Sequence, residues 1–235
     1  MKPWQVMERV DTAEGRLELR QRGDRDFLIT IGGRVLMTSA AHGSEDDLAR
    51  LACAAMIRKP RPHVLLGGLG MAFTLRAALD QLPPAAEVTV VDLNPRVVAW
   101  CQGPLASLTD DAASDRRVEI VVGDVARIIA DAPAGQYDAI VLDLYEGPRT
   151  HRSGTRPDPL YGIAAIERAW AALRLGGVLA VWSEEAAPLY EAQLARTGFR
   201  VQLHRGGGRG GRTHFIYVAV RPEQFRVPSH GSGAR

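Results

Sequence analysis

Three acidic residues stand where three apolar stretches of the sequence end. Asp92 follows "EVTVV", Asp124 follows "VEIVVG", and Asp143 follows "YDAIVL". If these stretches are parallel strands, their carboxyl ends meet at one edge of a sheet, where open α/β sheets bind ligands. Carboxylates at that edge suit a ligand with a ribose, an amine and a cationic centre, and they would repel a pyrophosphate. The pattern therefore predicts a nucleoside site.

A glycine-rich turn precedes the first of these acids. Gly67, Gly68 and Gly70 lie between an apolar run and a helix-like stretch. Glycines let the backbone approach a ligand closely, and the helix that follows presents free N–H groups. Asp92, next to Leu93, is placed to accept hydrogen bonds from a ribose diol. Each feature alone has an ordinary turn explanation. Together they favour S-adenosylmethionine or its decarboxylated form as the ligand.

The elements that must position these residues follow from the hydrophobic rhythm after residue 62. Apolar runs alternate with helix-like stretches, which indicates a parallel sheet covered on both faces. The last two runs, 199–205 and 214–221, leave no room for a crossover helix and predict an antiparallel hairpin. The fold class is therefore α/β, a mostly parallel, Rossmann-like methyltransferase sheet with an antiparallel C-terminal hairpin and a small N-terminal β element. We expect strands at 63–68, 87–93, 118–124, 137–147 and 176–185, and helices at 71–82, 95–108, 125–132, 162–173 and 187–198.

The N-terminal part has a different pattern. Alternating residues with turns near Gly15, Gly23 and Gly32 predict two or three antiparallel strands before residue 40. A helix should begin at Ser44, with Asp47 completing a near capping box, and end before Pro60. The expected division is an N-terminal β element (1–43), a Rossmann-like domain (44–222) and a flexible tail (223–235).

Composition narrows the class of protein. The 235 residues carry a formal charge of only +2, which gives no reason to expect nucleic-acid binding. The glycine-arginine run at 205–212 is better explained as a hairpin turn than as an RNA-binding segment. Cys53 and Cys101 have no metal or redox spacing and are expected to be core thiols, so no metal site is predicted. No leader pattern and no membrane-length apolar run is present, which predicts a cytoplasmic protein.

Several stretches resemble the spermidine synthase (polyamine aminopropyltransferase) family, which has a class I methyltransferase-like fold. They are "HVLLGGLGMAFTLRAAL", "VTVVDLNPRVV", "DRRVEIVVGDVARII", "YDAIVLDLYEGP", "DPLYG" and "LRLGGVLAVWS". The resemblance implies that the three glycines shape the nucleoside turn and that Asp92 binds the ribose. It also implies that Asp124 binds the adenine amine, with Val125 behind the ring. Asp143 would orient or deprotonate the attacking amine, and Tyr161 would lie beside the acceptor.

The sequence departs from the family pattern at three places. Family members have an acid inside the glycine turn, whereas Leu69-Gly70-Met71 supplies none. They repeat an aspartate three residues into the catalytic stretch, where this chain has Glu146. They also carry a Gln-, Tyr- and His-containing segment that contacts the polyamine. Here the corresponding segment has His42 and a run of acids.

The candidate reactions are displacements at a carbon bonded to a sulfonium. The protein must align the nucleophile, exclude water and keep an amine or hydroxyl nucleophile deprotonated. Asp143 and Glu146 are the predicted catalytic carboxylates, although Glu146 has an alternative as an exposed loop residue. Tyr145 is expected to line the wall of the cofactor pocket, and its alternative is to cap the core. Trp182 either shapes the acceptor site or precedes a helix N-cap at Ser183.

These observations favour methyl transfer to a small amine or hydroxyl acceptor. The alternative is aminopropyl transfer of the spermidine synthase type, and a second alternative is a non-catalytic nucleoside-binding scaffold. The arginine-containing loop at 147–159 is interpreted either as a lid or as a solvated loop. Apolar residues on both faces of the N-terminal strands predict a homodimer.

Overall fold

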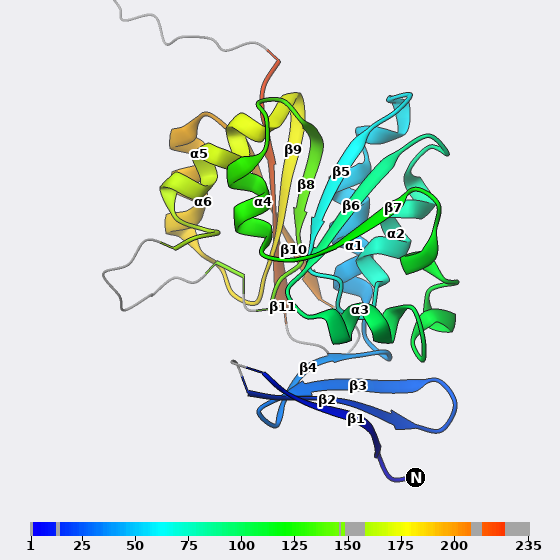
Figure 1. The fold of residues 1–235 in the computed structure, drawn as a ribbon. Helices are drawn as coiled ribbons and strands as arrows, with labels where there is room; N and C mark the ends of the chain where they lie inside the picture. The colour runs from blue at the N-terminus through cyan, green and yellow to red at the C-terminus, as the bar shows by residue number, and fades with distance from the viewer. Residues whose placement is uncertain (1, 13–14, 146, 149–157, 208–212, 224–235) are drawn as a thin grey trace, which may run out of the picture.

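The computed structural model describes residues 2–12, 15–145, 147–148, 158–207 and 213–223. These residues form a small sheet near the N-terminus and a large sheet flanked by helices (Figure 1). The small sheet is antiparallel, in the order β1-β2-β3-β4. Its strands are β1 (Gln5–Thr12), β2 (Gly15–Arg22), β3 (Asp26–Ile31) and β4 (Arg34–Thr38).

The small sheet has four strands, whereas the sequence predicts two or three. Gly32 and Gly33 have positive φ angles of 53° and 82°, so the chain reverses within two residues and β4 pairs with β3. Leu19, Phe27 and Ile29 of β2 and β3 are buried in the same apolar cluster as the helices of the main domain. The small sheet is therefore packed against the rest of the chain.

Helix α1 (Gly43–Cys53) connects the two sheets and begins one residue before the predicted start. The predicted capping box is wrong. His42 is the N-cap residue and makes no side-chain capping bond, while its carbonyl accepts the N–H groups of Glu45 and Asp46 at 3.1 Å. Ser44 lies inside the helix, and its hydroxyl donates to the Glu45 carboxylate. The domain boundary between residues 43 and 44 stays a prediction.

The large sheet has the strand order β10-β11-β9-β8-β5-β6-β7. The five strands from β9 to β7 are parallel, and β11 and β10 add an antiparallel hairpin at one edge. This confirms the predicted mostly parallel sheet with its C-terminal hairpin. The strands are β5 (His63–Gly67), β6 (Glu87–Asp92), β7 (Val118–Val122), β8 (Tyr137–Leu142), β9 (Leu173–Ser183), β10 (Arg200–Gly207) and β11 (Thr213–Val220).

Helices cover both faces of the large sheet (Figure 1). On one face lie α1, α2 (Phe73–Gln81) and α3 (Pro95–Cys101), and on the other lie α4 (Val125–Asp131), α5 (Ile163–Ala172) and α6 (Pro188–Thr197). Side chains of the central strands alternate between two apolar clusters. Val64 and Leu66 join the first cluster, and Leu65 joins the second. Burial on both faces explains why these strands read as continuous apolar runs.

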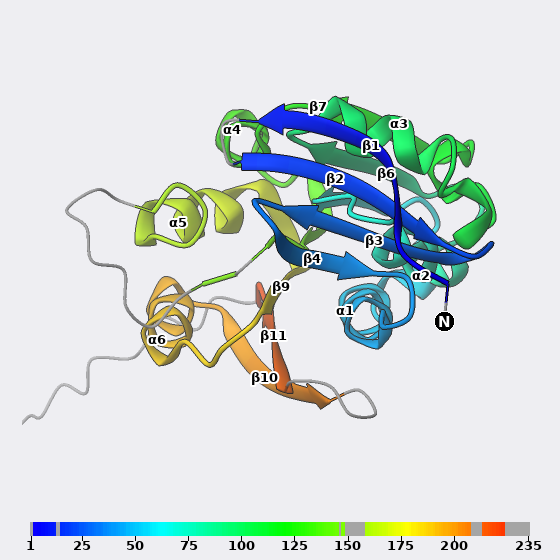
Figure 2. The same ribbon diagram turned by 90° about the horizontal axis from the view of Figure 1, so that it is seen from below.

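The small sheet lies across the carboxyl ends of the parallel strands, below the large sheet in Figure 1 and over α2 and α3 in Figure 2. The indole N–H of Trp100 on α3 donates to the Glu8 carboxylate on β1 at 2.6 Å. The backbone N–H of Met71, just after the glycine turn, points at the sulfur of Met37 on β4 at 3.2 Å. The small sheet is thus in contact with the edge where the ligand site is expected.

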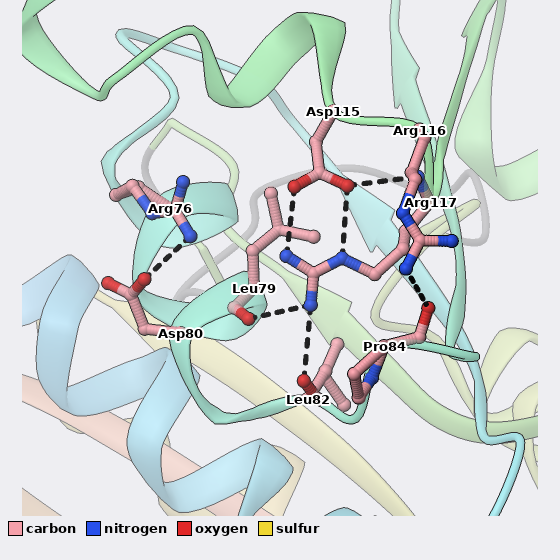
Figure 3. A network of polar contacts seen from close by, with 8 residues as sticks. All are labelled: Arg76, Leu79, Asp80, Leu82, Pro84, Asp115, Arg116 and Arg117. Carbon is pink, nitrogen blue, oxygen red and sulfur yellow. Dashed lines mark hydrogen bonds and ion pairs between the residues drawn. The ribbon is translucent and has the colours of Figure 1, made fainter.

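A polar network lies at the start of β7 and the end of α2 (Figure 3). The guanidinium of Arg117 pairs with the Asp115 carboxylate at 2.9 Å and also donates to the carbonyls of Leu79 and Leu82 at the end of α2. The hydrogen bonds from Arg117 lower the pKa of Asp115 to about 2. Because β7 begins at the next residue, this network ties the start of β7 to α2.

Candidate nucleoside and amine site

The glycine turn follows β5 and has no room for side chains. Gly68 has a φ of +90°, and a Cβ atom there would lie 2.1 Å from the backbone oxygen of Asp143. At Gly67 a Cβ atom would be 3.0 Å from side-chain atoms of both Leu142 and Val125. The backbone N–H of Gly68 donates to the carbonyl of Val91 at 2.9 Å, which links the turn to β6. Glycine therefore fits this crowded turn, and the predicted close approach of its backbone to a ligand stays a prediction.

Gly70 closes the turn and also has a positive φ, +53°. A Cβ atom there would lie 3.1 Å from the Sδ and Cε atoms of Met37. The buried thiol of Cys101 donates to the Gly70 carbonyl at 3.2 Å. Burial raises the pKa of both Cys53 and Cys101 to about 12, which fits their interpretation as unreactive core thiols.

Asp92 ends β6 and organises the turn from the side. One carboxylate oxygen accepts the backbone N–H of Leu69 at 2.9 Å, and the other accepts that of Asn94 at 2.8 Å. Burial raises the pKa of Asp92, and the backbone N–H groups of Asn94, Leu69 and Gly70 oppose that rise. The two oxygens offer about four acceptor sites to these three N–H groups, and the predicted ribose contact of Asp92 stays a prediction. The neighbouring Leu93 is 66% exposed, and its predicted place beside the cofactor stays a prediction.

Asp124 follows β7 and is the N-cap residue of α4. Its carboxylate accepts the backbone N–H of Ala126 at 2.9 Å, which is ordinary helix capping. The side chain is still 42% exposed, so it has lone pairs available to a ligand. Val125 behind it is buried against Gly67. The predicted adenine contact of these two residues stays a prediction.

Asp143 follows β8, and its backbone carbonyl packs under Gly68. Its carboxylate accepts the hydroxyl proton of Thr74, a buried residue in the first turn of α2. Burial raises the pKa of Asp143 to about 7, the negative charge of Glu45 adds to the rise, and the Thr74 hydrogen bond opposes it. A carboxyl group with that pKa is partly ionised near neutral pH and can both accept and release a proton.

Glu45 is the functional candidate that sequence reasoning missed. The residue is only 8% exposed, although it lies in the first turn of α1. The ring of His42 stacks on Phe73 with a centroid separation of 4.2 Å, which holds the start of α1 against the start of α2. Glu45 also shares a helix face with Leu48 and Ala52, both fully buried, and this spacing was the available signal.

The predicted acceptor residues lie in different surroundings. Tyr145 is 46% exposed, and the guanidinium of Arg34 on β4 lies 5.2 Å from its ring centroid. Tyr161 is partly buried and packs edge-on against Tyr190 at 5.8 Å. Trp182 is partly buried near the end of β9, where it pairs with Ile216 of β11. The three residues therefore stay candidates rather than one assembled pocket.

Ser183 does not cap a helix, as one interpretation of Trp182–Glu185 required. Its hydroxyl lies 3.1 Å from the carbonyl of Pro148 and 2.6 Å from that of Glu185, while α6 begins only at Pro188. Glu146, most of the predicted lid (149–157), the turn at 208–212 and the tail from 224 lie outside the described residues. Their predicted roles are untested.

Two kinds of feature are absent from the described part of the chain. No helix there is long and apolar enough to cross a membrane. Nor do the described residues place three or more His, Cys, Asp or Glu side chains together as a metal site.

Comparisons with known proteins relate the chain to one family. No family model matches the sequence. The polyamine aminopropyltransferase of Stenotrophomonas maltophilia is 25% identical over 203 residues, covering 86% of this chain and 67% of the relative. That of Xanthomonas euvesicatoria is 26% identical over 204 residues, with 83% and 67% covered.

Solved structures agree on the fold. Spermidine synthase from Thermotoga maritima superimposes with a TM-score of 0.72 at 18% identity, over 93% of this chain and 74% of the other. A probable spermidine synthase from Corynebacterium glutamicum gives 0.66 at 16% identity, over 96% and 83%. A spermidine synthase in complex with the transition state analogue AdoDATO gives 0.71 at 17% identity, over 93% and 73%. The sequence and the fold together relate this chain to the spermidine synthase-like family, whose methyltransferase-like fold it shares.

Proposed function

We propose that this chain is a transferase that moves the aminopropyl group of decarboxylated S-adenosylmethionine to a small amine acceptor. The position of Asp143 is the observation that carries the proposal. Its carboxylate lies at the carboxyl end of β8, its backbone closes the glycine turn, and its pKa is raised to about 7. The backbone of Asp143 therefore packs against the expected nucleoside turn, and its carboxylate can take a proton from an amine.

The main expectation from the sequence, methyl transfer, has less support than its alternative. The two relatives described above are named polyamine aminopropyltransferases, and the three solved structures are named spermidine synthases, one of them only as probable. The missing acid in the glycine turn had favoured methyl transfer. The structure offers another acid, Glu45, in the surroundings of Asp143, which removes that reason.

The proposed reaction forms one bond and breaks one. The acceptor nitrogen attacks the aminopropyl carbon bonded to sulfur, the C–S bond breaks, and its electron pair stays on the sulfur of the departing methylthioadenosine. Asp143 orients the amine and takes the proton that the nitrogen loses. The small sheet contacts the turn through Met37.

The products distinguish the candidate functions. The purified chain is incubated with decarboxylated S-adenosylmethionine or S-adenosylmethionine and a set of short aliphatic diamines, and nucleoside products are separated by chromatography. Aminopropyl transfer releases methylthioadenosine, whereas methyl transfer releases S-adenosylhomocysteine. We expect methylthioadenosine only, and release of S-adenosylhomocysteine would overturn the proposal.

The Asp143→Asn variant is the matched control. An amide keeps the shape but loses the base and the charge, so turnover should fall steeply while methylthioadenosine affinity stays nearly intact. Binding of the nucleoside with no turnover of either cofactor by the unmodified chain would instead favour the scaffold alternative.

A further inference from the structure

The buried charges of the site are out of balance. The carboxylate of Glu45 is buried and that of Asp143 is partly buried, and the two are close enough that the charge of Glu45 raises the pKa of Asp143. The partners of both groups are hydroxyls, Thr74 for Asp143 and Ser44 for Glu45. In the described part of the chain, neither carboxylate pairs with a lysine, arginine or histidine. Buried carboxylates without a countercharge are costly, and a bound cation relieves that cost.

The glycine turn of this chain contains no acidic residue. A side chain at Gly68 is excluded by the Asp143 carbonyl, and one at Gly67 would crowd side-chain atoms of Leu142 and Val125 at 3.0 Å. At Gly70, which has a positive φ of 53°, a Cβ atom would lie 3.1 Å from the thioether of Met37. The other two positions, Leu69 and Met71, are apolar and buried. Any anionic group that faces a ligand here must therefore come from another element.

Helix α1 is the element that brings one. The stacked rings of His42 and Phe73 join the first turns of α1 and α2, and Thr74 of α2 contacts Asp143. The stacking of His42 on Phe73 thus keeps the first turn of α1, which contains Glu45, beside α2, and the charge of Glu45 acts on Asp143. The other acids at this end of α1 are engaged elsewhere, since Asp46 bonds His42 and Asp47 pairs with Arg50.

We propose that Glu45 is a specificity-determining residue that, together with Asp143, holds the cationic amine of the ligand. This inference rests on the proposed function and adds to it the source of charge selectivity. Glu45 attracts an ammonium group and repels a carboxylate. The site should therefore prefer decarboxylated S-adenosylmethionine, which carries a lone ammonium on its propyl chain, to S-adenosylmethionine, which also carries a carboxylate.

Calorimetry with three ligands tests the role of Glu45. Decarboxylated S-adenosylmethionine, S-adenosylmethionine and uncharged methylthioadenosine are titrated into the full chain and into Glu45→Gln. We expect the variant to bind the decarboxylated compound at least tenfold more weakly and methylthioadenosine equally well. Its preference for the decarboxylated compound over S-adenosylmethionine should also narrow. Asp47→Asn, on the same helix but half-exposed and paired with Arg50, is the matched control and should change none of these affinities.

A second variant guards against a folding defect. Glu45→Leu removes the charge and offers an apolar side chain beside the buried Leu48, so it should fold and show the same loss of preference. Equal loss for all three ligands, or unchanged affinities in a folded variant, would overturn the role of Glu45. The proposed function fails separately, if the unmodified chain binds methylthioadenosine but releases none from the decarboxylated compound.

Discussion

Replacing Gly68 by alanine tests whether the glycine turn depends on the absence of a side chain. The new Cβ atom would lie 2.1 Å from the Asp143 carbonyl oxygen, whereas such contacts are essentially never shorter than 3.0 Å. The backbones of the turn and of the segment after β8 would have to separate by about 1 Å, the difference between those two distances. The movement would displace Asp143 itself, since its carbonyl is the group that is struck.

The cost has two parts. A non-glycine residue at a φ of +90° costs about 1–3 kcal/mol in backbone strain. Overpacking against rigid backbone costs about another 1–3 kcal/mol. We therefore expect Gly68→Ala to lower the free energy of unfolding by about 2–6 kcal/mol. Domains usually unfold with a free energy of about 5–15 kcal/mol, so a loss of this size is a large part of the total.

Urea denaturation followed by circular dichroism measures this change, and Gly123→Ala is the matched control. At Gly123 a Cβ atom would lie no closer than 3.9 Å to Val121, and φ is not positive. The control should therefore stay within about 0.5 kcal/mol of the parent chain. If Gly68→Ala is as stable as Gly123→Ala and keeps its methylthioadenosine affinity, the steric argument for the turn is refuted.

Four other predictions follow from the structure. Asp92→Ala should weaken methylthioadenosine binding at least tenfold, about 1.4 kcal/mol, because it removes the acceptor of the Leu69 and Asn94 N–H groups and the proposed ribose contact. An unchanged affinity, measured by calorimetry on a folded variant, would contradict this prediction. The pKa of Asp143 is raised from 3.8 to about 7, so between about pH 4 and 7 the folded state keeps a proton that the unfolded state loses. The free energy of unfolding of the parent chain should therefore fall relative to that of Asp143→Asn as pH rises through this range, by at most about 4 kcal/mol. A difference in unfolding free energy between the two chains that stays constant from pH 4 to 8 would exclude the effect. Arg117→Ala should lower the free energy of unfolding by about 2–3 kcal/mol, because it removes the partner of Asp115 and the donor to the carbonyls of Leu79 and Leu82. Arg116→Ala, which loses a single hydrogen bond to Pro84, should lower it clearly less in the same urea assay. Light scattering at tens of micromolar should give a homodimer that loses solubility when residues 1–40 are removed, since Met7 and Val35 leave apolar surface on the small sheet; a clean monomer would show that the sheet only caps its own domain.

The order of the elements could be predicted because it depends on local patterns. Strands buried on both faces read as apolar runs, and the hairpin of β10 and β11 follows from a connection too short for a helix. The strand-end positions of Asp92, Asp124 and Asp143 follow from the same patterns. The start of β9 was less predictable. It begins at Leu173, three residues before the predicted Gly176, because Leu173 pairs with Tyr137 of β8, and Gly176 has a positive φ of 74° within the strand.

The content of the site depended on contacts that no local pattern encodes. The role of Glu45 requires that α1 and α2 begin side by side, which the stacking of His42 on Phe73 secures across 31 residues of sequence. The capping prediction failed for a related reason. Ser44 was read as an N-cap from its neighbours, but its hydroxyl bonds the Glu45 carboxylate instead.

The contact between Met37 and Gly70 also has an evolutionary consequence. A side chain added at position 70 would have to shift the Met37 thioether, which also contacts the backbone N–H of Met71. Substitutions at positions 37 and 70 should therefore be coupled by epistasis. Among relatives we expect a larger residue at the position of Gly70 to occur with a smaller one at that of Met37. Where position 70 becomes acidic, selection to keep an acid at position 45 should relax.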